Sequence, residues 1–409
     1  MSKKEKKKIS KKTINLIAIL IIIIISLAFN ACYIIKQKLS ENVQAQGELI
    51  IDENVIISKE EEKQDTSISL CVVGDIMCHN TQYYDAYDSS TGRYDFSYVF
   101  TDIAEELSSA DLTIGNLETT FAGADRGYSS YPTFNTPDAL AENLKTIGFD
   151  ILSTANNHSL DKGYKGLVRT LEVLDDNGIS HMGTYASEEE QKEILVKDVN
   201  GIKIAFLAYT YGTNGIPVPS GKDYCVNLID KDMIKADLEK AKTLGVDLIS
   251  VNMHWGNEYK LKPSNEQEDL ADFLFENGAD IILGSHPHVI EPMEKRTITL
   301  DDGTTKEGFL IYSLGNFVSG QVKQYTNHSI ILNLGITKHA EGNITIDTVE
   351  YTPIYVYTKN TAPEGKFKIF DIKAEIDAYE SGNSNINKTL YNKLVEALEV
   401  TDEVMSNEI

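Results

Sequence analysis

Five short apolar runs in the sequence are each followed, within a few residues, by side chains that bind metals or transfer protons. In chain order these side chains are Asp75, then Asn116 and Glu118, then Asn157 and His158, then His254, and finally His286 and His288. Carboxylate, carboxamide and imidazole groups together suit Mn, Fe or Zn better than Ca, which prefers oxygen ligands alone. Taken singly, each residue has a structural explanation as a turn, cap or core residue. Five such positions together predict a site for divalent transition metal ions.

The number of candidate ligands indicates two ions. The predicted ligands are Asp75, Glu118, Asn157, His254, His286 and His288, with Asn116 and His79 as additional candidates. This set exceeds the needs of one tetrahedral zinc, whereas two ions that share a carboxylate would use it fully. Such an ion pair activates water and stabilises the oxygens of an in-line displacement. His158 directly follows a ligand, and we predict that it protonates the leaving group as a general acid.

Two of these histidines are separated only by a proline, in His286-Pro287-His288. In an extended strand their side chains would point to opposite sides, so both can bind the ions only if the chain turns there. Proline helps to fix such a turn. His181, His328 and His339 lie outside these patterns and are expected to be structural.

A repeated pattern of helix, turn and strand must position these residues. Three helical stretches end in a glycine, any one residue and an aspartate, followed by an apolar run: Gly148-Phe149-Asp150, Gly245-Val246-Asp247 and Gly278-Ala279-Asp280. Ala110-Asp111 is a fourth version that lacks the glycine. Glycine after a helix supplies the left-handed cap, and the apolar run is typical of a strand buried on both faces. Together with a first strand at Ile68 to Val73, the pattern predicts an α/β fold with parallel βα units. Since the carboxyl ends of parallel strands lie at one edge, the candidate side chains should meet there.

The N-terminal region has the pattern of an uncleaved membrane anchor. Residues 1–12 contain seven lysines, and the 23 residues of 13–35 carry no charge. As a helix this run would span about 34 Å, enough for a hydrocarbon core of about 30 Å. The lysines predict a single pass through the cell membrane, with the N-terminus inside and the domain extracellular. A cleaved signal peptide, with an apolar core of about 7–15 residues, is the main alternative, and a lipoprotein signal ending at Cys32 is another.

The remainder divides by composition. Residues 36–66 read as a polar stalk, 67–357 as the main domain, and 358–409 as a C-terminal extension with a terminal helix. The four cysteines are Cys32, Cys71, Cys78 and Cys225, and they include no CxxC pair, so neither a disulfide scaffold nor a cysteine zinc site is expected. Cys71 and Cys78 could pair outside the cell, but we expect buried free thiols.

The charge balance excludes nucleic acid as the main partner. Nine of the 38 basic residues and one of the 62 acidic residues lie in residues 1–38, so the rest of the chain carries a net charge of −32. Binding of nucleic acid phosphates needs a basic surface, which this composition does not provide. The 42% of hydrophobic residues gives ample material for a folded core.

The ordered motifs resemble the bacterial capsule synthesis proteins of the CapA or PgsA type, which take part in poly-γ-glutamate production and belong to the calcineurin-like metallophosphoesterase superfamily. The matching segments lie in family order over about 60% of the chain, and they are Gly74-Asp75-Ile76-Met77, Gly115-Asn116-Leu117-Glu118, Ala155-Asn156-Asn157-His158 with Asp161 and Gly163, His254-Trp255-Gly256 with Glu258 and Tyr259, His286-Pro287-His288-Val289, and Ser313-Leu314-Gly315-Asn316-Phe317. As a set they are highly specific.

The resemblance implies a four-layer α/β/β/α sandwich with two packed sheets. It also implies that Asn157-His158 corresponds to the Asn-His pair of the superfamily, and His286-Pro287-His288 to its terminal His-x-His. Glu118, or else Asn116, would stand in for the usual bridging aspartate. The opening Asp-x-His is not matched, because Met77 occupies the histidine position.

Two functional hypotheses of different classes follow from these residues and the resemblance. The first is a membrane-anchored, extracellular, metal-dependent hydrolase in poly-γ-glutamate or capsule polymer synthesis or export, with other membrane subunits and an anionic polymer as partners. The second is a non-catalytic, metal-stabilised subunit of the synthesis and export complex, which the missing histidine favours. A third alternative is a nucleotidase or diesterase unrelated to capsule. The acidic domain would need divalent cations or a local basic patch to bind an anionic polymer.

Overall fold

The computed structural model describes residues 64–299, 303–358 and 367–406. The predicted segment 1–12, the predicted anchor 13–35 and nearly all of the predicted stalk 36–66 lie outside these residues and stay predictions. Across the described ranges, no helix is both long enough and apolar enough to cross a membrane.

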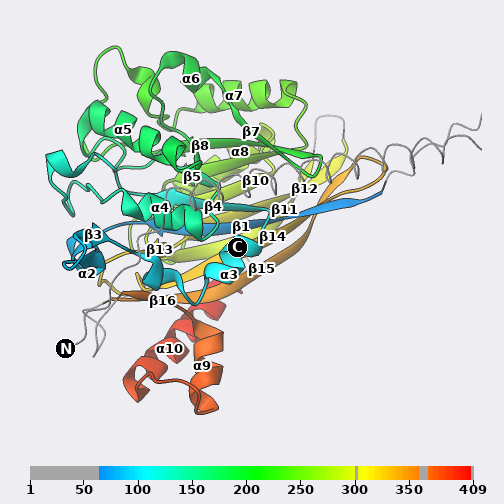
Figure 1. Ribbon diagram of the computed structural model, residues 1–409. Helices are drawn as coiled ribbons and strands as arrows, with labels where there is room; N and C mark the ends of the chain where they lie inside the picture. The colour runs from blue at the N-terminus through cyan, green and yellow to red at the C-terminus, as the bar shows by residue number, and fades with distance from the viewer. Residues whose placement is uncertain (1–63, 300–302, 359–366, 407–409) are drawn as a thin grey trace, which may run out of the picture. The chain divides into compact units, whose positions relative to one another are not determined.

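The described residues form two large β-sheets (Figure 1). The first sheet has the strand order β16 (Lys368–Asp371), β15 (Ile344–Tyr357), β14 (His328–Lys338), β1 (Thr66–Ile76), β4 (Leu112–Leu117), β5 (Ile151–Ser153) and β6 (Ser180–Met182), and β13 (Asn316–Val318) also pairs with β1. The strands β1, β4, β5 and β6 run parallel, whereas β14, β15 and β16 add antiparallel neighbours.

The second sheet has the order β11 (Ile290–Thr299), β12 (Thr305–Leu314), β10 (Ile281–Ser285), β9 (Leu248–His254), β8 (Ile202–Thr210) and β7 (Leu195–Val199). The four strands β8, β9, β10 and β12 are parallel, and β7 and β11 close the two edges in antiparallel pairing. A small hairpin is formed by β2 (Tyr87–Asp88) and β3 (Arg93–Tyr94).

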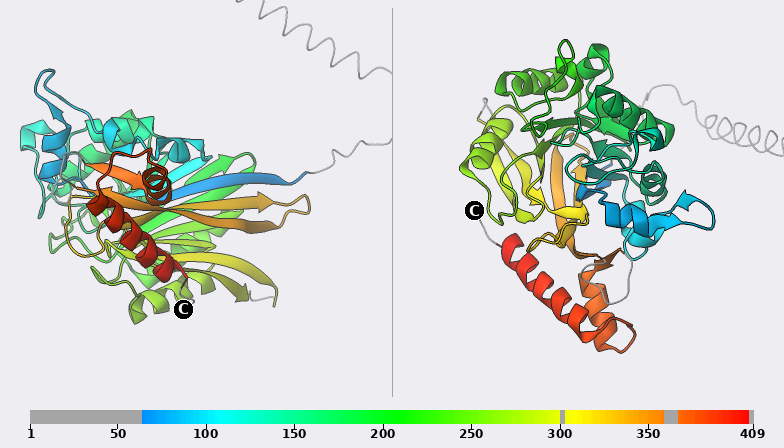
Figure 2. Two further views of the ribbon diagram at one scale, coloured as in Figure 1. Left: turned by 90° about the horizontal axis from the view of Figure 1, so that it is seen from below. Right: turned by 90° about the vertical axis from the view of Figure 1, so that its left-hand side faces the viewer.

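Alternating side chains bury both faces of each sheet. In β8, Ile204 and Phe206 contribute to the core between the sheets, whereas Leu207 and Tyr209 pack on the outer helices. This period of two is the pattern of a strand buried on both faces. The outer face of the first sheet packs on α2 (Asn80–Ala86), α3 (Ala104–Ser109), α4 (Ala139–Thr146) and α5 (Gly163–Asp176). The outer face of the second sheet packs on α7 (Lys231–Thr243) and α8 (Asn265–Glu276), so the layers are α/β/β/α as predicted (Figure 2).

The glycine–aspartate turns have the predicted geometry. Gly148, Gly245 and Gly278 follow helices α4, α7 and α8 with φ angles of 111°, 64° and 112°. The aspartate two residues after each glycine is hydrogen-bonded to the neighbouring strand. Asp280, for example, donates its backbone N–H to the Ile249 carbonyl and accepts the Ile249 N–H on its carboxylate at 2.7 Å. The same double contact joins Asp150 to Thr113, and Asp247 to Lys203, so these aspartates fix the amino ends of the parallel strands.

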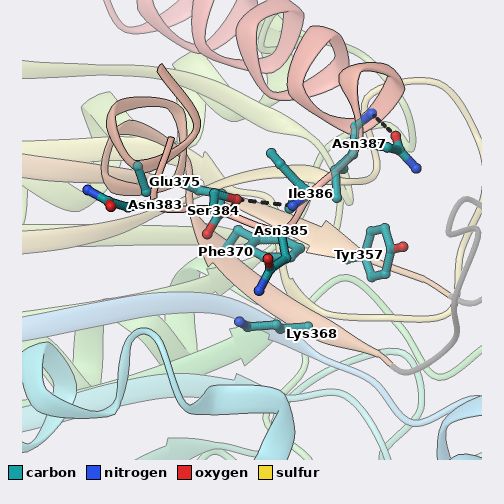
Figure 3. Close-up of a pocket in the computed structure, with 11 residues that line it drawn as sticks. Tyr357, Lys368, Phe370, Glu375, Asn383, Ser384, Asn385, Ile386 and Asn387 are labelled. Carbon is teal, nitrogen blue, oxygen red and sulfur yellow. Dashed lines mark hydrogen bonds between the residues drawn. The ribbon is translucent and has the colours of Figure 1, made fainter. Parts of the chain in front are cut away.

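The described chain ends in two helices, α9 (Ile372–Glu380) and α10 (Lys388–Met405). An apolar cluster joins them to β15 and β16 through Tyr355, Tyr357, Phe370, Ile372 and Leu394. A pocket of about 430 Å³ lies there, with Lys368 and the segment 383–387 in its lining (Figure 3). None of the predicted metal ligands lines this pocket. A shorter helix, α6 (Glu188–Lys192), precedes β7.

The cysteines that the structure describes are Cys71, Cys78 and Cys225, and all three are free and buried. This confirms the expectation of buried thiols for these residues. Cys32 lies outside the described residues.

Candidate metal centre

Six predicted ligands from both sheets meet at the carboxyl ends of the parallel strands. Asp75 lies in β1, Glu118 directly follows β4, and Asn157 lies in the loop after β5, all from the first sheet. His254 ends β9, and His286 and His288 follow β10, all from the second sheet. These side chains are at most 4% exposed. The first sheet therefore contributes the oxygen ligands, and the second sheet the imidazoles.

The ligand atoms form two overlapping groups that share one carboxylate. Glu118, His286 and His288 form one group, and Asp75, Glu118 and His254 form the other. Within each group the potential ligand atoms lie within 4.8 Å of one another. A shared carboxylate between two ligand groups is the arrangement that the sequence predicted for an ion pair.

The environment of Glu118 fits a metal site. Both carboxylate oxygens are buried without a hydrogen-bond partner among the described residues. Burial, and then the charge of Asp75, raise the pKa of Glu118 well above its usual value. A buried carboxylate without compensation is costly, and buried charges are normally paired or coordinate metals. Divalent ions would provide the missing compensation.

The His-Pro-His segment makes the turn that ligation requires. His286 has a φ of 101° and His288 a φ of 60°, both in a region that non-glycine residues rarely adopt. As a result both imidazoles face the same cluster, and their ring centroids are 5.8 Å apart. Such strained backbone is concentrated at functional sites.

Hydrogen bonds orient His288 and His254 so that the Nε2 atom of each ring faces Glu118. His288 Nδ1 donates to Asp75 Oδ2 and Asn316 Oδ1, both at 3.1 Å, and its Nε2 lies 3.7 Å from Glu118 Oε1. His254 Nδ1 lies 3.1 Å from the Ser285 hydroxyl and 3.3 Å from Asn116 Nδ2. Its Nε2 lies 3.2 Å from Asn157 Oδ1 and 3.8 Å from Glu118 Oε1, so it faces two predicted ligands. Partners of this kind orient metal-binding imidazoles.

Burial keeps two of the histidines neutral, as metal ligands must be. Burial, followed by the nearby His288, lowers the pKa of His286 to about 3. Burial, followed by the nearby His286, lowers the pKa of His254 well below its usual value. His286 Nδ1 is also buried without a hydrogen-bond partner among the described residues, which leaves it available as a ligand.

Asn116 supports Asp75 through a hydrogen bond. The strand register places Asp75 between Asn116 on β4 and Asn316 on β13. Asn116 Nδ2 donates to Asp75 Oδ1 at 2.7 Å, and its Oδ1 accepts from Asn156 Nδ2 at 3.3 Å. Glu118, the other residue considered for the bridging position, belongs to both ligand groups.

His79 lies outside both ligand groups, so the geometry gives no support to it as an additional metal ligand. Its Nδ1 accepts the backbone N–H of Gly320 at 3.1 Å, and its ring packs edge-on against Phe134, which in turn packs against His158. Burial lowers the pKa of His79 to about 4, so the ring stays neutral. The residue anchors the loop after β13 to the start of α2.

His158 is held beside the cluster by a buried carboxylate. Its Nδ1 lies 2.7 Å from Asp161 Oδ2, which also accepts the backbone N–H of Phe134 at 2.6 Å. His158 Nε2 lies 3.4 Å from the Asn214 amide, which comes from the loop after β8. This histidine is therefore oriented by contacts that involve none of the ligand residues.

Several residues of this centre were not assigned a role from the sequence. Tyr211 accepts a hydrogen bond from Asn157 Nδ2 at 3.2 Å, and its ring centroid is 4.6 Å from that of His286. For Asn316, the sequence did offer a signal, because the residue lies within one of the motifs that resemble the family. No such signal marked Ser285 or Tyr211. The remaining histidines are structural: His181 pairs with Asp175 and His339 with Asp65, and His328 lies in neither ligand group.

Comparison with known proteins agrees with this arrangement. The family model described as "Bacterial capsule synthesis protein PGA_cap" matches residues 69–321. The capsule biosynthesis protein CapA of Bacillus anthracis is 30% identical over 277 residues, which cover 66% of this chain and 64% of that protein. The PGA biosynthesis protein CapA of Bacillus subtilis is 30% identical over 312 residues, covering 74% of this chain and 75% of that protein.

Solved structures were compared as well. The NAD nucleotidase of Haemophilus influenzae has a TM-score of 0.46 at 15% identity, covering 85% of this chain and 62% of that chain. The calcineurin-like phosphoesterase YfkN of Bacillus subtilis has a TM-score of 0.40 at 15% identity, covering 83% of this chain and 98% of that chain. The family match spans more than half of the sequence and includes every residue of the candidate centre, and the chain belongs to the bacterial capsule synthesis protein family PGA_cap.

Proposed function

We propose that this protein is a membrane-anchored, extracellular, metal-dependent hydrolase that acts in the synthesis or export of a poly-γ-glutamate capsule polymer. The observation that carries the hydrolase proposal is the pair of ligand groups that share Glu118, whose two oxygens have no hydrogen-bond partner among the described residues. Six residues would hold two ions, of Mn, Fe or Zn: Asp75, Glu118, Asn157, His254, His286 and His288. Divalent ions in such a site supply Lewis-acid activation of water and stabilise charge on the reacting oxygens.

His158 would act as the general acid. Its Nδ1 is engaged by Asp161, so the proton for a leaving group would come from Nε2, the atom that lies beside Asn214. The buried Asp161 carboxylate fixes the ring orientation and stabilises positive charge on the imidazole when Nε2 is protonated. A positioned acid of this kind contributes typically about 10²–10⁴-fold to the rate.

Membrane anchoring rests on the sequence. The seven lysines before the uncharged run 13–35 support a cytoplasmic N-terminus and an extracellular domain. Relatives carry the names capsule biosynthesis protein and PGA biosynthesis protein, which supports a place within a polymer synthesis system and, with it, other membrane subunits as partners.

The test compares three histidine or aspartate variants of the full-length protein, purified in detergent and loaded with Mn²⁺. We expect His158→Ala to keep its metal but to lose about 10²–10⁴-fold of hydrolysis on a panel of phosphomonoesters, phosphodiesters and γ-glutamyl amides. Asp161→Asn should lose about 10–100-fold, because an orienting partner is removed. The control is His339→Ala, whose imidazole pairs with Asp65 outside the ligand groups.

A second candidate function is a non-catalytic subunit that keeps metal for structure. The observation that favours it is Met77, which is buried with its sulfur 3.7 Å from the Ser319 hydroxyl and cannot replace an imidazole as a ligand for Mn. In that case cells that express only His158→Ala would make normal amounts of polymer, and wild-type protein would hydrolyse nothing on the panel. Loss of polymer with His158→Ala, but not with His339→Ala, would support the enzyme instead.

A further inference from the structure

A lysine is held on an aromatic ring next to the candidate metal centre. Lys323 Nζ lies 4.0 Å from the centroid of the Tyr259 ring, and that ring is 6.1 Å from the ring of His288. An ammonium group over a tyrosine face is attracted by the negative face of the ring. The positive charge is therefore one ring away from a predicted ligand.

Both segments that form this contact are tied to the surroundings of the metal centre. Tyr259 has a φ of 66°, and its backbone N–H donates to the Pro287 carbonyl at 2.8 Å, inside the His-Pro-His turn. The loop that carries Lys323 is fixed at both ends by Asn316, whose Nδ2 donates to Gln321 Oε1 and to the Thr326 carbonyl. Asn316 is also the residue that accepts from His288 Nδ1. The lysine is thus placed by the same residues that orient the ligands.

The charge of Lys323 is not neutralised by a carboxylate. No ion pair in the described part of the chain includes Lys323, whereas Lys145, Lys306 and Lys338 at the amino ends of the strands each meet an aspartate. Lys260 and Lys262, on the segment that carries Tyr259, are exposed as well, against one exposed acid there, Glu258. In a domain with a strong negative net charge, Lys323 is thus a cation without an ion-pair partner among the described residues, held beside the metal centre.

We propose that Lys323, positioned on Tyr259, binds a carboxylate of an anionic polymer chain whose neighbouring unit occupies the metal centre. The inference rests on the proposed function and adds a specificity-determining residue to it. A substrate that offers a second negative charge beyond its reacting group would gain a contact at Lys323, whereas a neutral substrate would not. This subsite is the local basic patch that an acidic domain needs in order to hold a polyanion.

The test measures binding of fluorescein-labelled deca-γ-glutamate to the full-length protein in detergent by fluorescence anisotropy. We expect Lys323→Gln, which removes the charge but keeps a polar, unbranched side chain, to weaken binding about three- to tenfold at low salt, and this difference should shrink as salt is raised. The matched control is Lys231→Gln, because Lys231 lies 4.9 Å over Phe273 in the outer helical layer. This control should bind deca-γ-glutamate as the wild type does. Neutral deca-glutamine should bind equally to the wild type and to both variants.

Equal binding of deca-γ-glutamate by Lys323→Gln, Lys231→Gln and wild type would overturn the proposal. A ten-unit polyphosphate serves as the second polyanion: a loss for polyphosphate alone would also overturn the assignment of a carboxylate. The metal content and hydrolysis of the same samples separate this inference from the proposed function. If metal content and hydrolysis are intact and all three proteins bind the polymer equally, only the Lys323 subsite is rejected. If the wild type hydrolyses nothing but Lys323→Gln still binds the polymer more weakly, only the hydrolase proposal is rejected.

Discussion

The two ends of the parallel strands use the same acidic residue types in opposite ways. At the amino ends, every carboxylate of the helix–strand turns accepts a backbone N–H of a neighbouring strand, and three of the four also meet a lysine; the four are Asp111, Asp150, Asp247 and Asp280. At the carboxyl ends, Asp75 accepts from Asn116, His288 and the His286 backbone N–H, whereas Glu118 faces imidazoles and has no donor among the described residues. The carboxylates of the amino edge are therefore hydrogen-bonded within the chain, whereas Glu118 at the carboxyl edge is left for ligands from outside it.

This difference separates stability from chemistry. A carboxylate that accepts backbone N–H groups and meets a lysine stabilises the fold, since its charge is compensated. A carboxylate such as Glu118, buried beside another acid without a donor, destabilises the metal-free protein unless its charge is removed or paired. Burial alone does not separate Glu118 from Asp280, which is also buried, whereas the partners of their oxygen atoms do.

The largest expected effect is the loss of metal from the carboxyl edge. Replacing both His286 and His288 with Ala removes both imidazoles of the ligand group that they form with Glu118, and also the His288 contact to Asp75 of the other group. We therefore predict that stoichiometric binding of transition metal is abolished. The fold should be retained, because both residues follow a strand and lie outside the apolar clusters. Metal analysis of the purified protein and circular dichroism check the two statements. An unchanged metal content in a folded double variant would show that the ions bind elsewhere.

Glu291 is a buried carboxyl group that belongs neither to the helix–strand turns nor to the metal centre. It accepts one hydrogen bond, from Gln267 Nε2 at 2.7 Å, while its Oε1 has no partner among the described residues. Burial raises the pKa of Glu291 from its usual value of 4.5 to about 8. The folded state therefore holds the proton, and this contribution to stability is complete below about pH 4.5 and is lost as the pH rises through about 8.

We predict that Glu291→Gln removes this pH dependence. Relative to the variant, the wild type should lose a few kcal/mol of unfolding free energy between pH 5 and pH 9, at about 1.4 kcal/mol per unit of pKa shift. Urea unfolding of both proteins at a series of pH values measures the difference. Parallel curves for the two proteins would mean that Glu291 titrates normally.

A smaller effect is expected at the amino edge. Asp280→Ala removes the carboxylate that accepts the Ile249 N–H and pairs with Lys306, and hydrogen bonds to charged groups contribute about 1.5–3 kcal/mol. We expect destabilisation of about 2 kcal/mol with an unchanged metal content. Asp176→Ala, an exposed position on α5, should change stability by less than about 0.5 kcal/mol. Loss of metal from Asp280→Ala would break the proposed division between the two edges.

Local patterns predicted much of this architecture. The glycines at 148, 245 and 278 and their aspartates mark the helix ends and strand starts because a left-handed cap and a buried strand are local requirements. The side chains at the strand ends followed from the same pattern. The need for a turn at Pro287 followed from simple strand geometry, and the structure has that turn.

Long-range packing supplied what the patterns lacked. The periodicity of β9 and β10 resembles that of β4 and β5, yet the two pairs lie in different sheets, and only the resemblance to a family implied two sheets. His79 lies four residues after Asp75, but its ring contacts Gly320, which is remote in sequence. The contact between Lys323 and Tyr259 likewise joins two loops that no local pattern connects.

The most direct measurement is a titration of the full-length protein with Mn²⁺, followed by electron paramagnetic resonance. Two ions per chain with a spin-coupled spectrum are predicted for the wild type, because Glu118 belongs to both ligand groups. Glu118→Gln should bind at most one ion without coupling, whereas Glu291→Gln, a matched change of another buried glutamate, should keep both coupled ions. A wild type that binds no stoichiometric Mn²⁺, or a folded Glu118→Gln that binds two coupled ions, would contradict a metal pair at this edge.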